Sequence, residues 1–120
     1  MSESKSIMIV DDSLVSRIML KNIIVDLEPS WEVFEAANAS EALSLAEKHK
    51  NFDMLTLDMN MPGKTGLSIA PALLEKFPQA KIALLTANIQ DSVRNKATAM
   101  GLEFIAKPIT EDKIEQFIHH

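Results

Sequence analysis

The chain carries the run Ser6-Ile7-Met8-Ile9-Val10 directly before two acidic residues, Asp11 and Asp12. Four successive apolar residues without polar alternation are typical of a strand buried on both faces. Such strands occur in parallel sheets that helices cover on each side. The two acidic residues then stand at the carboxyl end of the strand, the edge where open parallel sheets bind their ligands.

Short apolar runs alternate with longer amphipathic segments along the rest of the chain, which is the rhythm of a parallel α/β sheet. Further strands are predicted at residues 31–36, 52–57, 81–85 and 103–106. Helices are predicted between and after the strands, with these apolar stripes: Leu14, Ile18, Ile23 and Leu27, ending at Pro29; Ala42, Leu43 and Ala46 within 39–49; Leu67, Ala70, Leu74 and Phe77; Ile89, Val93, Ala97 and Met100; Ile114, Phe117 and Ile118. The five units predict a doubly wound α/β fold with both faces of the sheet covered.

Local signals refine the helix ends. Asn38 with Glu41 three residues later is typical of a helix N-terminus, and we prefer this interpretation to a glycosylation site. Gly101 is predicted to follow the C-cap of the fourth helix. Pro71 is tolerated in the third helix only in or near the first turn, and it kinks the helix elsewhere.

Composition excludes several classes of protein. The 120 residues are the length of one domain. The 17 acidic against 12 basic residues argue against direct binding of nucleic acid. The chain has no Cys, which excludes disulfides, thiolate metal sites and Cys nucleophiles. No leader-like segment and no apolar run near the roughly 20 residues of a membrane span is present. We therefore expect a cytoplasmic domain, residues 1–120, that contacts no membrane.

Four of the five predicted strands are followed by a polar or charged residue. Asp11 and Asp12 follow the first strand, Asp58 the third, Thr86 the fourth and Lys107 the fifth. The second strand delivers no such residue, as expected of a strand at the rim of the sheet. Because the carboxyl ends of parallel strands share one edge, these side chains are predicted to gather there.

Three carboxylates at one edge repel one another. Neighbouring strands are about 4.8 Å apart, and two charges ~4 Å apart repel by roughly 4 kcal/mol at an effective dielectric constant near 20. A hard divalent cation removes this conflict, and Mg²⁺ suits a site with few carboxylates, water and a phosphate. Lys107 can reach across as a charge for an anion. The residues therefore predict a site for Mg²⁺ and a phosphoryl group.

Each of these residues also has a purely structural interpretation. Asp58 can open a turn and Lys107 can be a solvated surface residue. The remaining alternatives are helix caps: Asp12 or Ser13 for the first helix, and Thr86 or Asn88 for the fourth. It is the joint placement at consecutive strand ends that favours a functional site.

Two other patterns are rejected. Gly63-Lys64-Thr65 looks like the end of a P-loop, but residue 58, where that motif has its first Gly, is Asp. The histidines His49, His119 and His120 show no spacing typical of metal ligands. Neither pattern predicts a site.

The strand-end residues and their spacing resemble the receiver domains of two-component response regulators. The resemblance rests on the pair Asp11-Asp12, on Asp58 at the start of 58–66, on Thr86-Ala87 and on Lys107-Pro108, and it covers nearly the whole chain. It implies a flavodoxin-like (βα)₅ fold with a parallel five-stranded sheet of order 2-1-3-4-5, an order already known for chemotaxis receivers.

The resemblance also implies a role for each acidic residue. Asp58 is expected to accept a phosphoryl group from a phosphohistidine of a sensor histidine kinase or a phosphotransfer protein. Asp12, Asp58 and the backbone carbonyl of Asn60 are expected to hold Mg²⁺, with Asp11 acting directly or through water.

The remaining matched residues are assigned to the response to phosphorylation. Lys107 is expected to pair with the phosphate, and its bond to Pro108 is expected to be cis. Thr86 is expected to bond a phosphate oxygen, and Phe104 occupies the place of the family's switch aromatic residue.

We expect a switch that regulates a downstream effector through the face made by the fourth helix, fifth strand and fifth helix. We favour a stand-alone regulator of the chemotaxis type, and a receiver cut from a longer protein is the alternative that the sequence leaves open. The chain is expected to be a monomer or a phosphorylation-dependent dimer. We expect no enzymatic activity beyond slow hydrolysis of the chain's own phosphoryl group. The alternatives are a Mg²⁺-dependent phosphohydrolase that uses Asp58 as nucleophile, and a pure interaction module.

Overall fold

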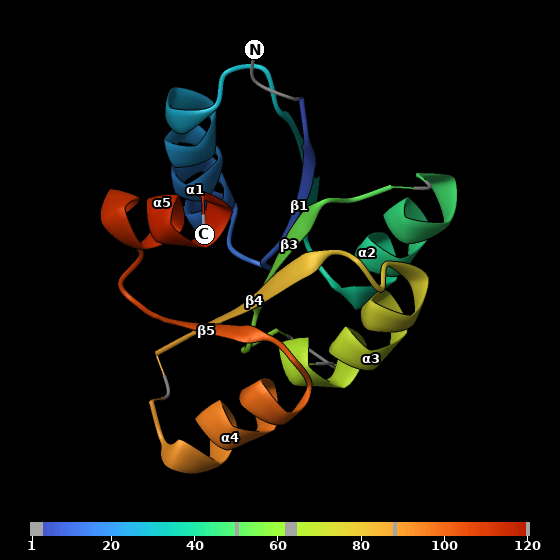
Figure 1. Cartoon of the computed structure of the whole chain (residues 1–120), viewed down its shortest axis with the longest axis vertical. Helices are drawn as coiled ribbons and strands as arrows, with labels where there is room; N and C mark the ends of the chain where they lie inside the picture. Colours follow the sequence, from blue (N-terminus) through green and yellow to red (C-terminus); the bar gives the residue numbers. More distant parts are fainter. Residues whose placement is uncertain (1–3, 50, 62–64, 88, 120) are drawn as a thin grey trace.

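A computed structural model describes residues 4–49, 51–61, 65–87 and 89–119, and it contains one parallel sheet of five strands in the order β2-β1-β3-β4-β5 (Figure 1). This confirms the predicted fold. The elements alternate along the chain as β1 Ser6–Val10, α1 Leu14–Leu27, β2 Glu32–Ala36, α2 Ala39–Lys48, β3 Met54–Asp58, α3 Gly66–Lys76, β4 Lys81–Thr86, α4 Asp91–Ala99, β5 Glu103–Ala106 and α5 Glu111–His119.

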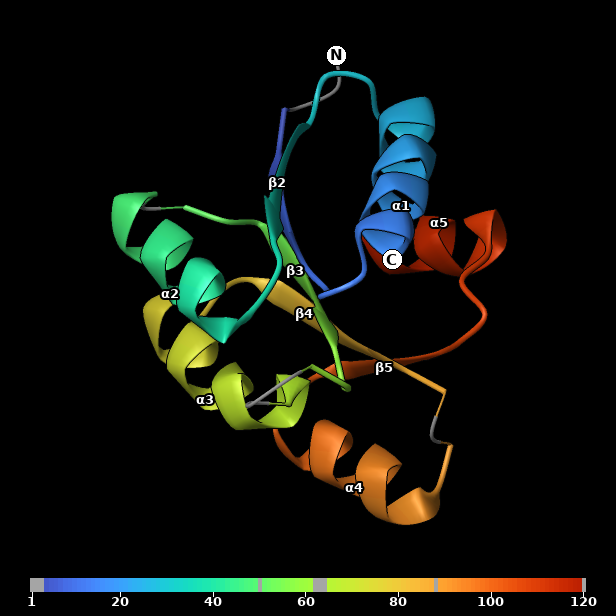
Figure 2. The ribbon, with the colours of Figure 1, turned by 180° about the vertical axis from the view of Figure 1, so that it is seen from behind.

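Helices cover both faces of the sheet (Figures 1 and 2). α1 and α5 pack on one face, where Leu20, Ile24 and Ile114 join Ile7 and Ile9 of β1 in one apolar cluster. The other face is covered by α2, α3 and α4, in a second cluster that contains Met8 and Val10. β1 is therefore buried on both faces, as its unbroken apolar run predicts.

The register of the strands brings their carboxyl ends together. Val10 is paired with Leu57, so that β1 and β3 end side by side, and Asp58 is paired with Leu85 of β4. Asp58 and Thr86 are the last residues of their strands rather than the first residues after them. The sheet itself thus fixes the backbone of both residues.

Some predicted ends shift by one or two residues. Trp31 and Phe52 precede β2 and β3 and lie in the core beneath them, being 8% and 4% exposed. α4 begins at Asp91 with Gln90 as N-cap, so Thr86 does not cap it, and Ile89 is exposed instead of facing the core. The alternative cap Asn88 lies outside the described residues.

The apolar stripe predicted for α1 is wrong in its first half. Leu14 and Ile18 are 58% and 48% exposed, whereas Leu20 and Ile24 are buried. Apolar residues occur on nearly every side of this helix, so their spacing alone cannot select the face that meets the sheet.

Other local predictions are confirmed. The Asn38 side chain caps α2 by accepting the Glu41 N–H at 2.8 Å. Gly101 follows the C-cap Met100 with a φ of 81°, the left-handed conformation in which glycine is favoured. Pro71, by contrast, is the sixth residue of α3, beyond the first turn in which the sequence favours it, and the helix continues past it to Lys76. No helix in the described ranges has both the length and the apolar character needed to cross a membrane.

Candidate phosphoryl and metal site

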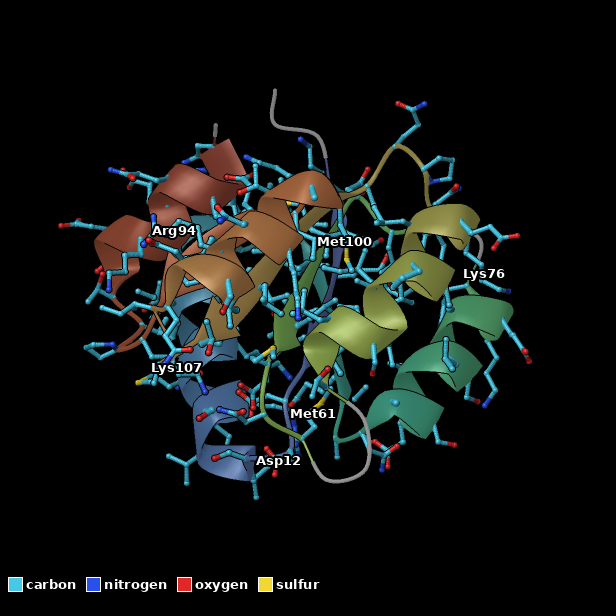
Figure 3. All side chains as sticks on the ribbon, turned by 90° about the horizontal axis from the view of Figure 1, so that it is seen from below. Asp12, Met61, Lys76, Arg94, Met100 and Lys107 are labelled. Carbon is cyan, nitrogen blue, oxygen red and sulfur yellow. The ribbon has the colours of Figure 1, made fainter. Side chains whose placement is uncertain are left out.

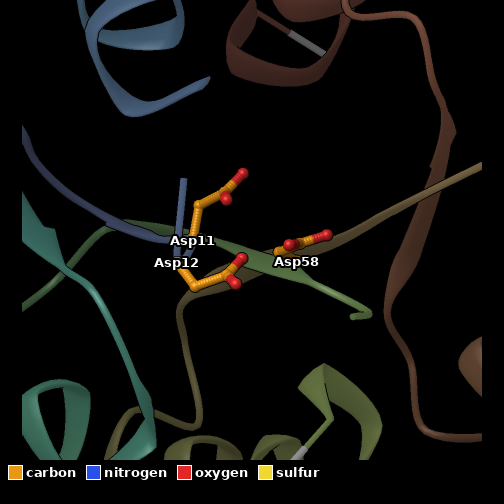
Figure 4. A group of neighbouring side chains, drawn as sticks. All are labelled: Asp11, Asp12 and Asp58. Carbon is orange, nitrogen blue, oxygen red and sulfur yellow. The ribbon is translucent and has the colours of Figure 1, made fainter. Parts of the chain in front are cut away.

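The structure brings the three predicted acidic residues together at the carboxyl edge of the sheet. Asp11 and Asp12 follow β1 and Asp58 ends β3, and one carboxylate oxygen from each of the three lies within 4.8 Å of the other two (Figure 4). Asp11 and Asp58 are each 4% exposed, while Asp12 is exposed to solvent. Two of the three charges are therefore largely removed from water.

Hydrogen bonds to β2 and to Ser13 hold Asp11 in place. Its N–H donates to the Ala36 carbonyl of β2 at 3.0 Å, and its Oδ1 accepts the N–H of Ser13 at 2.8 Å. Burial raises the pKa of the Asp11 carboxyl, and the charge of Asp58 adds to this effect, against the hydrogen bond from Ser13. Without a cation, the site therefore disfavours a further negative charge.

Ser13, and not Asp12, caps α1. The Ser13 hydroxyl accepts the N–H of Ser16 at 3.2 Å, which is the bond of an N-cap side chain. Asp12 is therefore not the helix cap that its position also allowed, because Ser13 provides the cap.

Lys107 supplies the positive charge of the site. Its Nζ lies 3.1 Å from Asp58 Oδ1, and its backbone N–H donates to the Thr86 carbonyl oxygen at 2.9 Å. Seen from below, Lys107 and Asp12 occupy the same edge of the molecule (Figure 3). The Lys107–Pro108 peptide bond is cis, as expected.

The residues around Asp58 are closely packed. Thr86 is fully buried at the end of the neighbouring strand β4. The N–H of Asn60 points to Asp58 Oδ1 at 3.4 Å, which begins the turn after β3. The predicted turn residues 62–64, including Gly63 and Lys64, lie outside the described part of the chain.

Gly66 lets α3 start directly against Asp58 at the end of β3. A Cβ at this position would lie 2.6 Å from the Asp58 carbonyl oxygen and 2.9 Å from Leu84 Cδ1. Real side chains do not tolerate such distances, so a larger residue would displace the backbone of Asp58. The sequence alone did not reveal this requirement.

Phe104 lies on the edge strand β5, which β4 separates from β3 and Asp58. The guanidinium carbon of Arg94, from α4, lies 4.7 Å from the centre of the Phe104 ring. A hollow of about 310 Å³ runs beside this strand, and α5 contributes Lys113, Gln116 and Phe117 to its wall. The stacking of Arg94 on Phe104 is not predictable from either residue in the sequence.

The three carboxylates fit a hard divalent cation. They offer oxygen ligands that converge within 4.8 Å, and among the described residues the salt bridge to this group comes from Lys107, at Asp58. Within the described part of the chain, a group of three or more His, Asp or Glu side chains close enough to share a metal ion occurs here and nowhere else. His49 packs on Phe34, and His119 pairs with Glu28 on α1, so these histidines join no such group.

Comparison with known proteins places this geometry in a family. The sequence pattern of the response regulator receiver domain matches residues 7–119. The chain is 36% identical over 110 residues to the chemotaxis protein CheY of Listeria monocytogenes and covers 90% of each chain. It is 33% identical to the transcriptional regulatory protein CitT of Bacillus subtilis, and it spans 47% of that longer relative's length.

Solved structures agree with the sequence relatives. The CheY4 protein of Vibrio cholerae superposes with a TM-score of 0.87 at 27% identity, over 98% of both chains. A CheX-CheY-BeF3-Mg²⁺ complex of Borrelia burgdorferi gives 0.86 at 26% identity, over 95% of this chain and 86% of the other.

A response regulator of Burkholderia pseudomallei, with a phosphorylated aspartic acid, a calcium ion and citrate, gives a TM-score of 0.80 at 28% identity, over 95% of this chain and 66% of the other. The family match over nearly the whole chain, the CheY relative of similar length and the shared sheet order lead to one conclusion. The chain belongs to the family of response regulator receiver domains.

Proposed function

We propose that the chain is a phosphorylation-activated switch that accepts a phosphoryl group on Asp58 from a phosphohistidine of a sensor histidine kinase or phosphotransfer protein. The observation that carries the proposal is the position of Asp58. It is 4% exposed, lies among Asp11 and Asp12, and is paired with Lys107 at 3.1 Å. A buried carboxylate with one lysine and two further acids beside it is suited to bind a cation and a phosphoryl group together.

In the transfer step, a carboxylate oxygen of Asp58 attacks phosphorus in line with the bond to the donor imidazole. The P–N bond breaks, its electron pair leaves with the imidazole, and an acyl phosphate forms on Asp58. Lys107 Nζ, which pairs with Asp58 in this structure, moves its contact to the phosphoryl oxygens. Mg²⁺, when bound, would neutralise part of the charge of the transferred phosphoryl group.

We assign the metal to Asp12, Asp58 and the carbonyl of Asn60, with Asp11 as a direct or water-mediated ligand. The convergence of the carboxylates supports this assignment. So do the Mg²⁺ in the Borrelia burgdorferi complex and the calcium ion and phosphorylated aspartic acid in the Burkholderia pseudomallei protein.

A switch and a phosphohydrolase differ in the number of phosphoryl groups that each chain processes. We expect acetyl phosphate and Mg²⁺ to add one phosphoryl group per chain, detected by intact mass spectrometry, and we expect no sustained turnover of p-nitrophenyl phosphate. Among the described residues, the carboxyl groups clustered with Asp58 are those of Asp11 and Asp12, which we assign to the cation, so this cluster offers no general acid for a leaving alcohol. Many turnovers per chain, without accumulation of labelled protein, would favour the hydrolase instead.

We assign the docking of the histidine donor to the exposed apolar side of α1. Leu14, Val15, Ile18 and Met19 are 58%, 75%, 48% and 45% exposed, and they form two i, i+4 rows in the first turns of the helix. These rows begin two residues after Asp12. A donor that places its imidazole in line with Asp58 must cover this rim, and two apolar rows fit an amphipathic helix of the donor.

If the donor docks on α1, substitutions there should slow phosphotransfer from a histidine kinase but not from acetyl phosphate. Val15→Glu combined with Ile18→Glu should slow phosphotransfer from a purified histidine kinase that labels the wild-type chain by at least tenfold, because two charges must be buried at the interface. Labelling by acetyl phosphate, which needs no docking surface, should remain within twofold. Val25→Glu, on the far part of the same helix, is the matched control. Equal slowing with both donors would contradict docking on α1.

We assign the response to the face of α4, β5 and α5. Phosphorylation adds nearly two negative charges beside Thr86, which ends the strand next to β5. Movement of the Thr86 hydroxyl towards the phosphate shifts the loop before α4 and frees space for Phe104, which Arg94 now contacts. The hollow beside β5 then changes shape for an effector protein, as a shift between two populated states.

Thr86→Ala should separate chemistry from switching. We expect the variant to accept phosphate at a rate within about threefold of wild type, because attack depends on Asp58, Lys107 and the cation. The chemical shifts of residues around Phe104, however, should change by less than half as much as in the phosphorylated wild-type chain. The matched control is Thr98→Ala, an exposed threonine on α4. Full shifts in phosphorylated Thr86→Ala would mean that the signal takes another route.

A further inference from the structure

Arg17 joins the loop that carries the acidic pair to the neighbouring strand. Its side chain is only 13% exposed, although it lies in the first turns of α1. The Nη1 group donates to the backbone carbonyl of Asp11 at 2.5 Å, and the Nε group donates to Glu35 Oε1 of β2 at 3.2 Å. One guanidinium therefore holds the loop and the strand together.

Arg17 completes the set of hydrogen bonds to Asp11. The N–H of Asp11 is bound to β2, its Oδ1 accepts the Ser13 N–H, and its carbonyl accepts from Arg17. The carbonyl of Asp11 belongs to the peptide that leads to Asp12. Rotation of this peptide would turn the Asp12 carboxylate away from Asp58, and the mutual repulsion of the three carboxylates favours such a rotation.

We propose that Arg17 is a positioning residue, which fixes the Asp11–Asp12 peptide so that both carboxylates converge with Asp58 on the cation. The proposal rests on the function proposed above and adds a residue that the sequence analysis did not single out. The guanidinium donates through two nitrogen atoms held in one plane, Nη1 to the carbonyl and Nε to Glu35, and the single Nζ of a lysine does not reproduce this fork.

Lys21 provides the matched control. Its Nζ lies 3.7 Å from the other carboxylate oxygen of Glu35, it carries the same charge, and the structure gives it no bond to the acidic loop. If Arg17 acted only by its charge, its removal would strengthen binding of a cation, since a like charge near the site is lost. If Arg17 positions the loop, its removal weakens binding. The two explanations differ in sign.

The experiment compares Arg17→Met, Arg17→Lys and Lys21→Met with the wild-type chain. The dissociation constant of Mg²⁺ alone is measured by calorimetric titration. We expect Arg17→Met to bind Mg²⁺ about tenfold more weakly, the size of effect seen for groups that orient metal ligands. Lys21→Met should bind within twofold of wild type or more tightly. Arg17→Lys, which keeps the charge, should also bind at least threefold more weakly than wild type.

Amide hydrogen exchange in EDTA gives a second measurement that needs no metal. The Asp11 and Ser13 amides should exchange about tenfold faster in Arg17→Met, after correction for global stability from denaturant unfolding, and at the wild-type rate in Lys21→Met. Mg²⁺ binding by Arg17→Met that equals or exceeds that of Lys21→Met, or unchanged exchange, overturns the proposal. If Arg17→Met does not fold, Arg17→Lys decides by the same criteria. A wild-type chain that binds no Mg²⁺ contradicts the proposed function, while the exchange experiment still tests the role of Arg17.

Discussion

Replacement of Asp58 by Asn is expected to abolish covalent labelling of the chain by acetyl phosphate and Mg²⁺. Among the three clustered acids, Asp58 is the one paired with Lys107, at 3.1 Å, so an entering phosphoryl group meets a cation and a nucleophile only there. An amide nitrogen or oxygen is a far weaker nucleophile than a carboxylate and forms no stable acyl phosphate. Intact mass spectrometry should show the added phosphoryl mass on the wild-type chain and none on Asp58→Asn.

A matched control comes from the opposite edge of the same sheet. Asp53 lies just before β3, and its carboxylate accepts the Ser6 N–H at 2.9 Å. Asp53→Asn should therefore be labelled as fully as wild type, provided that the measured stability allows folding. Full labelling of Asp58→Asn at another residue would show that the acceptor has been assigned wrongly.

The architecture could be predicted because the sheet is parallel and buried. The uninterrupted apolar run of β1, with residues 7–10 at most 1% exposed, has no interpretation as a half-exposed strand. Because the carboxyl ends of parallel strands share one edge of the sheet, Asp58 and Thr86 are predicted at that edge without any knowledge of packing. The register confirms that both residues lie at this edge, on adjacent strands.

Contacts made across the sequence could not be predicted in the same way. The side of α1 that faces solvent depends on the match between helix and sheet, so the spacing predicts Leu14 and Ile18 in the core although they are exposed. Arg17 bridges Asp11 and Glu35, which are 6 and 18 residues away from it, and no local pattern encodes that distance. Long charged side chains reach partners that only the folded chain brings close.

The crowding of carboxylates has a thermodynamic consequence for the folded chain. Asp11, Asp12 and Asp58 converge in the native state, whereas the unfolded chain separates Asp58 from the other two by more than forty residues. Lys107 offsets part of the repulsion at Asp58. Asp12 is exposed, so solvent screens the repulsion between its carboxylate and the other two. In the absence of metal we estimate that this one charge destabilises the fold by about 1 kcal/mol.

Asp12→Ala should therefore raise the free energy of unfolding in EDTA by about 1 kcal/mol, since the substitution removes a charge and empties no core position. Ser13 provides the cap of α1, so the substitution does not remove a helix cap. At a Mg²⁺ concentration one hundred times the wild-type dissociation constant, the wild-type chain should gain about 2.7 kcal/mol, and a variant that binds a hundredfold more weakly only about 0.4 kcal/mol. The order of stability of the two proteins should thus reverse between EDTA and Mg²⁺.

Urea unfolding of both proteins, in EDTA and in Mg²⁺, gives the four free energies that this comparison needs. Asp26→Ala, which removes an exposed carboxylate from the last turns of α1, controls for the change in net charge and should leave the Mg²⁺ gain at its wild-type value. An Asp12→Ala chain less stable than wild type in EDTA would mean that the carboxylate stabilises the fold by some contact of its own. An equal Mg²⁺ gain in both proteins would place the cation away from Asp12. Reversal of the order, by contrast, requires that the carboxylate which destabilises the metal-free fold is the one that binds the metal.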